Sequence, residues 1–240
     1  MKQELSKKTR TESDLIGSRE VPESALYGVQ TLRGIENFRI SKFHLNEYPL
    51  FIQALAITKM GAAIANRELD LLTKEQTDAI LKACKEILEG KYRDQFPVDM
   101  IQGGAGTTTN MNANEVIANR ALELMGHQRG EYQYCSPNDH VNRSQSTNDA
   151  YPTAIHIGLY YTHLKLVKHF ETLIQSFRKK GEEFANIIKM GRTQLEDAVP
   201  MTLGQTFNGF ASILEHEVKN LDFAAQDFLT VNMGATAIGT

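Results

Sequence analysis

Apolar residues recur at helical spacing along much of the 240-residue chain. Residues 50–69 are rich in Ala, Ile and Met, which predicts a buried helix. A second helix is expected to begin at Thr73 and to end near Gly90, because Thr73 and Gln76 have the spacing of a capping box. Residues 1–48 hold turn residues between short apolar pieces and predict an irregular start.

The same periodicity predicts three further helices, at about residues 114–125, 152–183 and 205–231. Pro152 suits the first turn of the second of them, where its missing N–H costs nothing. Between the last two helices, residues 187–197 predict a loop with a short extended piece. Helices of this length with amphipathic faces need partners that bury those faces.

These elements predict a mostly α fold with two domains. Residues 1–145 are expected to form an N-terminal mixed domain with short strands and helices. Residues 146–240 are expected to form the first part of a central helical bundle, which is incomplete within this chain. One antiparallel pair of long helices leaves apolar faces uncovered, so we expect the chain to aggregate or self-associate.

Composition excludes several classes of protein. A hydrophobic content of 41% and a charged content of 23% are typical of soluble globular proteins. The net charge of −3 gives no electrostatic reason to bind nucleic acid or an anionic membrane. No apolar stretch approaches the roughly 20 residues that span a bilayer, and the basic residues 2–10 lack the apolar run of a signal peptide. We therefore expect no nucleic acid and no membrane as partners, and a cytoplasmic location.

Metal and cofactor chemistry also lacks a signal in the sequence. The two cysteines, Cys84 and Cys135, are too few and too far apart for a disulfide framework or a zinc site. Cys84 lies on the apolar stripe of a predicted helix, which favours a small core residue over a nucleophile. No HxxxH, HExxH or paired CxxC motif occurs, so no metal and no cofactor are expected.

The longest polar segment is SPNDHVNRSQSTND, residues 136–149, in which Val141 is the one aliphatic side chain. It leads directly into a predicted helix. Free backbone N–H groups and the positive end of the helix dipole lie at such a start, so neutral hydroxyl and amide donors there suit a carboxylate or phosphate. The alternative is a capping loop without a ligand, because Ser, Thr, Asn and Asp are also the common helix caps.

A second polar segment, IQGGAGTTTNMNAN, covers residues 101–114. Its glycines would allow the backbone to approach a ligand closely, with Thr107 and the two threonines after it supplying hydroxyls. No apolar strand precedes the glycines and the GxGxxG spacing is absent, which argues against a dinucleotide loop. The alternative is a strained turn that enters a helix.

A third polar segment, GRTQLED, covers residues 191–197. Thr193 and Gln194 offer neutral donors there, beside the guanidinium of Arg192. The alternative is a salt-bridged loop between two helices. Each of the three segments is a weak signal alone, whereas their combination is specific.

Four stretches resemble the aspartase/fumarase superfamily: GGAGTTTNMNANEVIANRALELMG, SPNDHVNRSQSTNDAYPT, GRTQLEDAVPMTLGQ and VNMGATAIGT. The likeness runs from about Arg10 to the last residue. Ser146-Thr147-Asn148 is similar to the aspartases, where fumarases usually carry two serines, and Gln194 stands where fumarases carry histidine. Glu196 departs from the glutamine usual in the family. The resemblance favours the aspartase branch, with a class II fumarase and a non-catalytic remnant of the fold as alternatives.

The resemblance implies a carbon–nitrogen lyase that converts L-aspartate reversibly to fumarate and ammonia, by proton abstraction from Cβ through an aci-carboxylate. It implies six substrate-binding residues: Thr107, Ser146, Thr147, Asn148, Thr193 and Gln194. Ser146 and Thr147 would hold the β-carboxylate that becomes the aci-carboxylate. Thr107 and Asn148 would face the amino group. Thr193 would hold the α-carboxylate, with Gln194 nearby.

The resemblance also implies parts that lie outside these 240 residues. The general base of the superfamily is a serine on a mobile Gly-Ser-Ser loop, and no GSSxMPxKxN motif occurs here. Members are homotetramers in which each active site draws loops from three subunits. We therefore expect this chain to be the N-terminal part of a longer lyase and to have no lyase activity alone.

Overall fold

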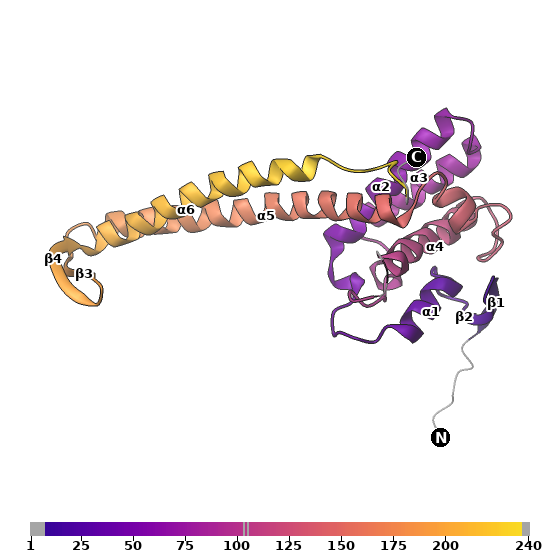
Figure 1. Cartoon of the computed structure of the whole chain (residues 1–240), viewed down its shortest axis with the longest axis horizontal. Coiled ribbons are helices and arrows are strands. Elements are labelled where there is room, and N and C mark those ends of the chain that lie inside the picture. The colour runs from indigo at the N-terminus through magenta and orange to yellow at the C-terminus, as the bar shows by residue number, and fades with distance from the viewer. Residues whose placement is uncertain (1–7, 103, 105, 237–240) are drawn as a thin grey trace, which may run out of the picture. The chain divides into compact units, whose positions relative to one another are not determined.

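The computed structural model describes residues 8–102, 104 and 106–236 (Figure 1). Of the segments singled out above, residues 2–7, Gly103, Ala105 and residues 237–240 lie outside the described residues. The chain divides into two compact units, and each is described by itself. The first consists of Met1–Gly158 with Val231–Thr240, and the second of Leu159–Thr230. The domain boundary expected after residue 145 stays a prediction.

The first unit is a helical body preceded by an antiparallel hairpin of strands β1 (Thr9–Asp14) and β2 (Gly17–Pro22). Its longer helices are α1 (Val29–Asn37), α2 (Pro49–Glu68), α3 (Lys74–Leu88), α4 (Thr107–Leu124) and the beginning of α5 (Thr147–Glu183). Its short helical turns are η1 (Leu45–Glu47), η2 (Arg93–Gln95) and η3 (Pro137–Val141). The prediction of a mostly α fold with short strands is confirmed.

Helices α2, α3 and α4 form the core of the first unit. Leu55, Ile80 and Ile117, one from each helix, are fully buried there, and Cys84 lies among them as expected of a core residue. The capping box that begins α3 is confirmed, because the Thr73 hydroxyl accepts a 3.2 Å hydrogen bond from the Gln76 N–H. Local sequence signals were sufficient to predict α2 and α3, because the apolar pattern and the capping box indicate the same helices that packing stabilises.

Two buried carboxylates satisfy the first N–H groups of α1. Glu115, on α4, accepts hydrogen bonds of 2.8 Å from the N–H groups of Gly28 and Gln30. It accepts a third, of 3.0 Å, from Thr31, and Glu12 accepts from the one remaining N–H group of that turn at 3.0 Å. A side chain at Gly28 would collide with both carboxylates, because its Cβ would lie 2.4 Å from a Glu12 oxygen.

Two predicted helix starts were wrong. Helix α4 begins at Thr107 and not at residue 114, because its polar first turns are held by tertiary hydrogen bonds that outweigh weak helix propensity. The Asn110 side chain, for example, donates to the side-chain oxygen of Asn142 at 3.1 Å. Helix α5 begins at Thr147, so Pro152 lies inside the helix and not in its first turn.

The second unit is a pair of long helices joined by a hairpin. The remainder of α5 is followed by β3 (Ile188–Thr193) and β4 (Glu196–Thr202), and then by α6 (Leu203–Ala225) and η4 (Gln226–Leu229). Figure 1 shows α5 and α6 side by side, with the hairpin between them in the chain. Within the described residues, no helix is both long and apolar enough to cross a membrane.

Contacts between α5 and α6 are both aromatic and polar. The rings of Phe177 and Phe207 lie 6.0 Å apart, and the Arg178 guanidinium pairs with the Glu215 carboxylate at 2.8 Å. Further along the pair, a nitrogen of the buried His163 lies 2.8 Å from the Asp222 carboxylate. Helix α6 was predicted to reach residue 231 but ends at Ala225, where a short 3-10 turn follows.

The segment predicted as a loop over residues 187–197 is an antiparallel hairpin. Thr193 pairs with Glu196, so Gln194 and Leu195 form a two-residue turn, with φ of 50° and 66°. Such turns usually carry Asn or Gly because both residues have positive φ. Gln and Leu give no such signal, which is why the sequence did not predict the hairpin.

Candidate functional site

The first turns of α4 and α5 contact each other in the first unit. Gly106, which precedes α4 with a φ of 85°, packs so closely on Tyr151 that a Cβ would lie 2.5 Å from its ring. One turn further on, the Asn110 side chain donates a 3.2 Å hydrogen bond to the Thr147 hydroxyl. Thr107 is therefore the exposed first residue of a helix whose start lies against the start of another. Both helix starts bring N–H groups and the positive end of a dipole to this place.

Ser146 and Thr147 form the entry to α5. The Ser146 hydroxyl accepts from the Asn148 N–H at 3.2 Å, and the Asp149 carboxylate accepts from the Ser146 N–H at 2.9 Å, which is a reciprocal helix cap. The capping role considered for this segment is therefore present. A hydroxyl that accepts one hydrogen bond still keeps its own hydrogen to donate, so the hydroxyls of Ser146 and Thr147 can each donate to a ligand. The side chain of Asn148 is exposed beside them.

A fully buried lysine of α2 lies behind this entry. The Lys59 ammonium donates a 2.8 Å hydrogen bond to the side-chain oxygen of Asn110. It donates two more, both of 2.9 Å, to the side-chain oxygens of Asn142 and Gln145. Three acceptors thus match the three donors of an ammonium group. Burial lowers the pKa of Lys59 to about 7, although the nearby Asp149 carboxylate acts in the opposite direction.

The Asp149 carboxylate is also fully buried and fully engaged. One oxygen accepts from the N–H groups of Ser146 and Ala150, at 2.9 and 2.6 Å. The other accepts from the Gly234 N–H at 2.9 Å. These bonds fix the first turn of α5 and attach the segment after α6 to it. Asp149 is therefore a structural carboxylate and not a free base.

The structure places four of the six predicted site residues around the two helix starts of the first unit: Thr107, Ser146, Thr147 and Asn148. Thr193 and Gln194 lie at the tip of the β3–β4 hairpin in the second unit, where both are exposed. Beside them, Arg192 pairs with Asp197 at 3.3 Å, as the salt-bridged alternative for this segment required. The substrate-binding roles of all six residues stay predictions.

Sequence reasoning missed the groups that support the site. Lys59 lies within the helix predicted over residues 50–69, four residues from Leu55 and four from Ala63. That spacing places the lysine on the same face as two buried residues. A lysine on a buried face needs polar partners, because an unpaired buried charge is very costly. Its partners, which include Asn110, come from segments far away in the sequence and could not be identified from it.

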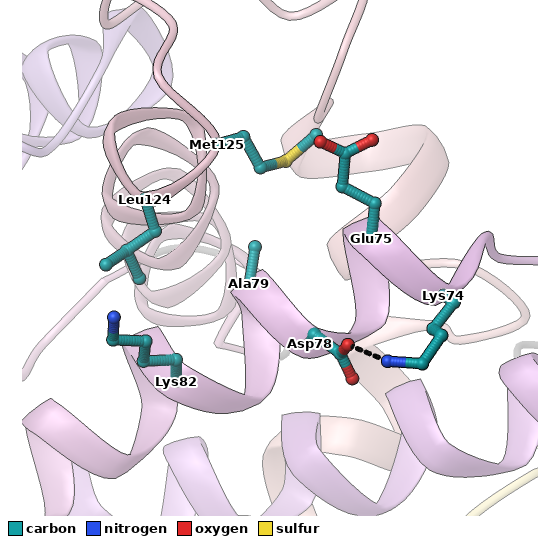
Figure 2. Close-up of a pocket in the computed structure, with 7 residues that line it drawn as sticks. All are labelled: Lys74, Glu75, Asp78, Ala79, Lys82, Leu124 and Met125. Atoms are coloured by element: carbon teal, nitrogen blue, oxygen red, sulfur yellow. Dashed lines mark hydrogen bonds and ion pairs between the residues drawn. The ribbon is translucent and has the colours of Figure 1, made fainter.

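A separate surface hollow of about 490 Å³ lies between α3 and the end of α4 (Figure 2). Lys74 and Asp78 form an ion pair at its edge, and Lys82 and Met125 also line it. It contains none of the predicted site residues and mixes charges of both signs, so it gives no argument for a particular ligand. Among the described residues, no three His, Cys, Asp or Glu side chains are grouped so that they could hold a metal ion.

Comparison with known protein families identifies the class to which this mostly α chain belongs. A family model described as Lyase matches residues 17–240. The chain belongs to this lyase family.

Individual relatives show which members of the family this chain is similar to. Aspartate ammonia-lyase of Escherichia coli strain K12 is 56% identical over 237 residues, or 98% of this chain. Aspartate ammonia-lyase of Pseudomonas canavaninivorans is 57% identical over 232 residues, or 96% of this chain. The chain spans about half the length of these relatives, 50% and 49%. The resemblance to the aspartase/fumarase superfamily is confirmed.

Solved structures agree with this placement. The native structure of fumarate lyase:delta crystallin from Brucella melitensis has a TM-score of 0.93 and 50% identity, and the match covers 95% of this chain and 53% of that one. The structure of class II fumarase from Schistosoma mansoni has a TM-score of 0.90 and 37% identity, and the match covers 97% of this chain and 49% of that one. Both aspartate lyases and a fumarase are therefore among the relatives of this chain.

Proposed function

We propose that the protein containing this chain is an aspartate ammonia-lyase, which converts L-aspartate to fumarate and ammonia. The observation that carries the proposal is the contact between two helix starts that present Thr107, Ser146, Thr147 and Asn148. Relatives named aspartate ammonia-lyase, more than half identical over nearly the whole chain, support the choice of substrate.

The difficult step of this reaction is the removal of a proton from the carbon next to a carboxylate. The β-carboxylate then becomes an aci-carboxylate with two negative charges, which forms only if donors are already oriented around it. Hydroxyls and helix N-termini provide such donors without competing for the proton. The proposal assigns the hydroxyls of Ser146 and Thr147 to this group, and the oxygens of Thr107 and Asn148 to the substrate ammonium.

The α-carboxylate is assigned to Thr193, with Gln194 near it, on the β3–β4 hairpin. The turn supports this assignment because Gln194 and Leu195 both have positive φ. Non-glycine residues pay for that conformation, and such strain is common at ligand-binding segments. In the family's homotetramers a site combines loops of three subunits, so the hairpin of one copy would serve a site on another. The general base is not among the residues assigned here.

A class II fumarase is the second candidate, because the Schistosoma mansoni structure matches this chain with a TM-score of 0.90. A fumarase adds water to fumarate and gives malate, so both enzymes share fumarate and its two carboxylates. Both candidate functions therefore require the donors of α4 and α5 to bind a carboxylate. They differ in the group that leaves, which is ammonia in one and water in the other.

Assaying both substrates separates the candidates. The protein expressed from the full coding sequence is incubated with L-aspartate or with L-malate, and fumarate is followed by its ultraviolet absorbance. Fumarate and ammonia from aspartate, with little fumarate from malate, is the expected result. Turnover of malate alone would establish the fumarase, and turnover of neither substrate would establish a non-catalytic member of the family.

A further inference from the structure

Pro152 interrupts the backbone hydrogen bonds of α5 directly behind the candidate site. In an α-helix each N–H donates to the carbonyl four residues earlier, so the residue at position 152 would normally donate to the Asn148 carbonyl. Proline has no N–H, and its ring also crowds that carbonyl. The helix nevertheless continues through Pro152 to Glu183. The Asn148 carbonyl therefore lacks its usual donor within the helix and is free to accept from another segment.

Asn232 supplies that donor. Its side-chain amide donates a 3.0 Å hydrogen bond to the Asn148 carbonyl. Two residues later, the Gly234 N–H donates to the buried Asp149 carboxylate at 2.9 Å. A turn with a 3.0 Å hydrogen bond from the Ala235 N–H to the Asn232 carbonyl holds the segment between them in shape. The stretch after η4 is thus attached to two consecutive residues in the first turn of α5.

The peptide group that receives the Asn232 amide is connected to the proposed substrate donors. Its own N–H, that of Asp149, donates to the Ser146 carbonyl at 3.3 Å. The Asn148 N–H, on the other side of the same residue, donates to the Ser146 hydroxyl at 3.2 Å. A rotation of Asn148 would therefore change the orientation of the Ser146 hydroxyl. A residue that fixes Asn148 acts on the site through it.

We propose that Asn232 is a positioning residue: its amide replaces the N–H that Pro152 lacks, and so fixes Asn148 and Ser146 for the substrate. This inference rests on the proposed function, because it assumes that Asn148 and Ser146 contact L-aspartate. It assigns Pro152 a role as well. The proline frees a carbonyl of α5, and the freed carbonyl becomes the docking point for the segment that follows α6.

A double-mutant cycle tests the pairing of Asn232 with Pro152. Asn232→Leu removes the amide at similar size, and Pro152→Ala returns an N–H to position 152. One neutral hydrogen bond is at stake, so Asn232→Leu is expected to raise KM for aspartate about fivefold, with a smaller change in kcat. In the Pro152→Ala background the same substitution is expected to change KM little, because the helix then supplies its own donor.

Control variants separate the effect of the Asn232 amide from a general change in the protein. Asn220→Leu changes an exposed asparagine of α6 and is expected to leave KM unchanged. Asn232→Ala, which removes the amide without added bulk, is measured in parallel, and circular dichroism confirms that each variant is folded. An unchanged KM in both Asn232 variants, or an equal rise with and without Pro152→Ala, would overturn the inference. Failure of the unmodified protein to release fumarate from aspartate would overturn the proposed function, and the inference with it.

Discussion

At the scale of single residues, one buried ammonium holds the polar segment in front of α5. Lys59 donates to Asn110, Asn142 and Gln145, which come from α4 and from the loop before α5. Asn110 in turn donates to the Thr147 hydroxyl. A side chain of α2 with no access to a ligand thereby sets the position of a proposed substrate donor. Removal of the ammonium would take this donor from the side-chain oxygens of Asn110 and Gln145, whereas that of Asn142 would still accept from two neighbouring amides.

Lys59→Met is therefore expected to lower the free energy of unfolding by about 2 kcal/mol near neutral pH, because buried amide oxygens lose a charged partner. The loss should grow with pH. Burial lowers the pKa of Lys59 from its ordinary value of 10.5 to about 7, so between these values the unfolded chain binds more protons than the folded one. The wild type thus gains stability as the pH rises through this window, and the Met variant does not.

Urea unfolding of both proteins at about pH 6 and about pH 9 measures this difference. Lys85→Met, at an exposed position of α3, is the matched control and is expected to change stability by no more than about 0.5 kcal/mol at either pH. A difference between wild type and Lys59→Met that stays constant or shrinks with pH would contradict the lowered pKa.

At the scale of elements, α1 is held by carboxylates that are distant in the sequence. Glu115→Gln is expected to destabilise the protein by about 2 kcal/mol, because an NH₂ group would then face backbone N–H groups that now donate to a carboxylate. The melting temperature, measured by thermal unfolding with circular dichroism of the helical signal, reports this change in stability. Glu75→Gln, at an exposed position of α3, is the control. Equal melting temperatures for Glu115→Gln and the wild type would show that the carboxylate does not hold α1.

The same elements show how far the sequence predicts the fold. The start of α3 was predictable because Thr73 and Gln76 cap it within one turn. The start of α4 was not, because its polar residues bond to groups such as Asn142 and Thr147 that only the folded chain brings near. The β3–β4 hairpin escaped prediction because its turn lacks the usual Asn or Gly. Tertiary hydrogen bonds and unusual turns account for these errors.

At the scale of the whole molecule, the proposal assigns substrate contacts to residues of both units. The density of hydroxyls and amides in the sequence marked the segments at the helix starts, and the family resemblance selected the four residues within them. Their support by Lys59 and Asp149 could not be predicted, since those contacts join segments distant in the chain. The exposed Thr193 and Gln194 belong to the second unit, and their substrate-binding role stays a prediction.

The most direct test of the proposed function is the kcat/KM for L-aspartate of Thr147→Val, compared with that of Thr147→Ser. Both changes are made in the protein expressed from the full coding sequence. Valine keeps the shape of threonine but removes the hydroxyl, so kcat/KM is expected to fall about 100-fold, as for other single donors to a developing oxyanion. Serine keeps the hydroxyl and is expected to retain most of the activity. Retention of activity within about twofold by a folded Thr147→Val variant would contradict the assignment of this helix start as the carboxylate site.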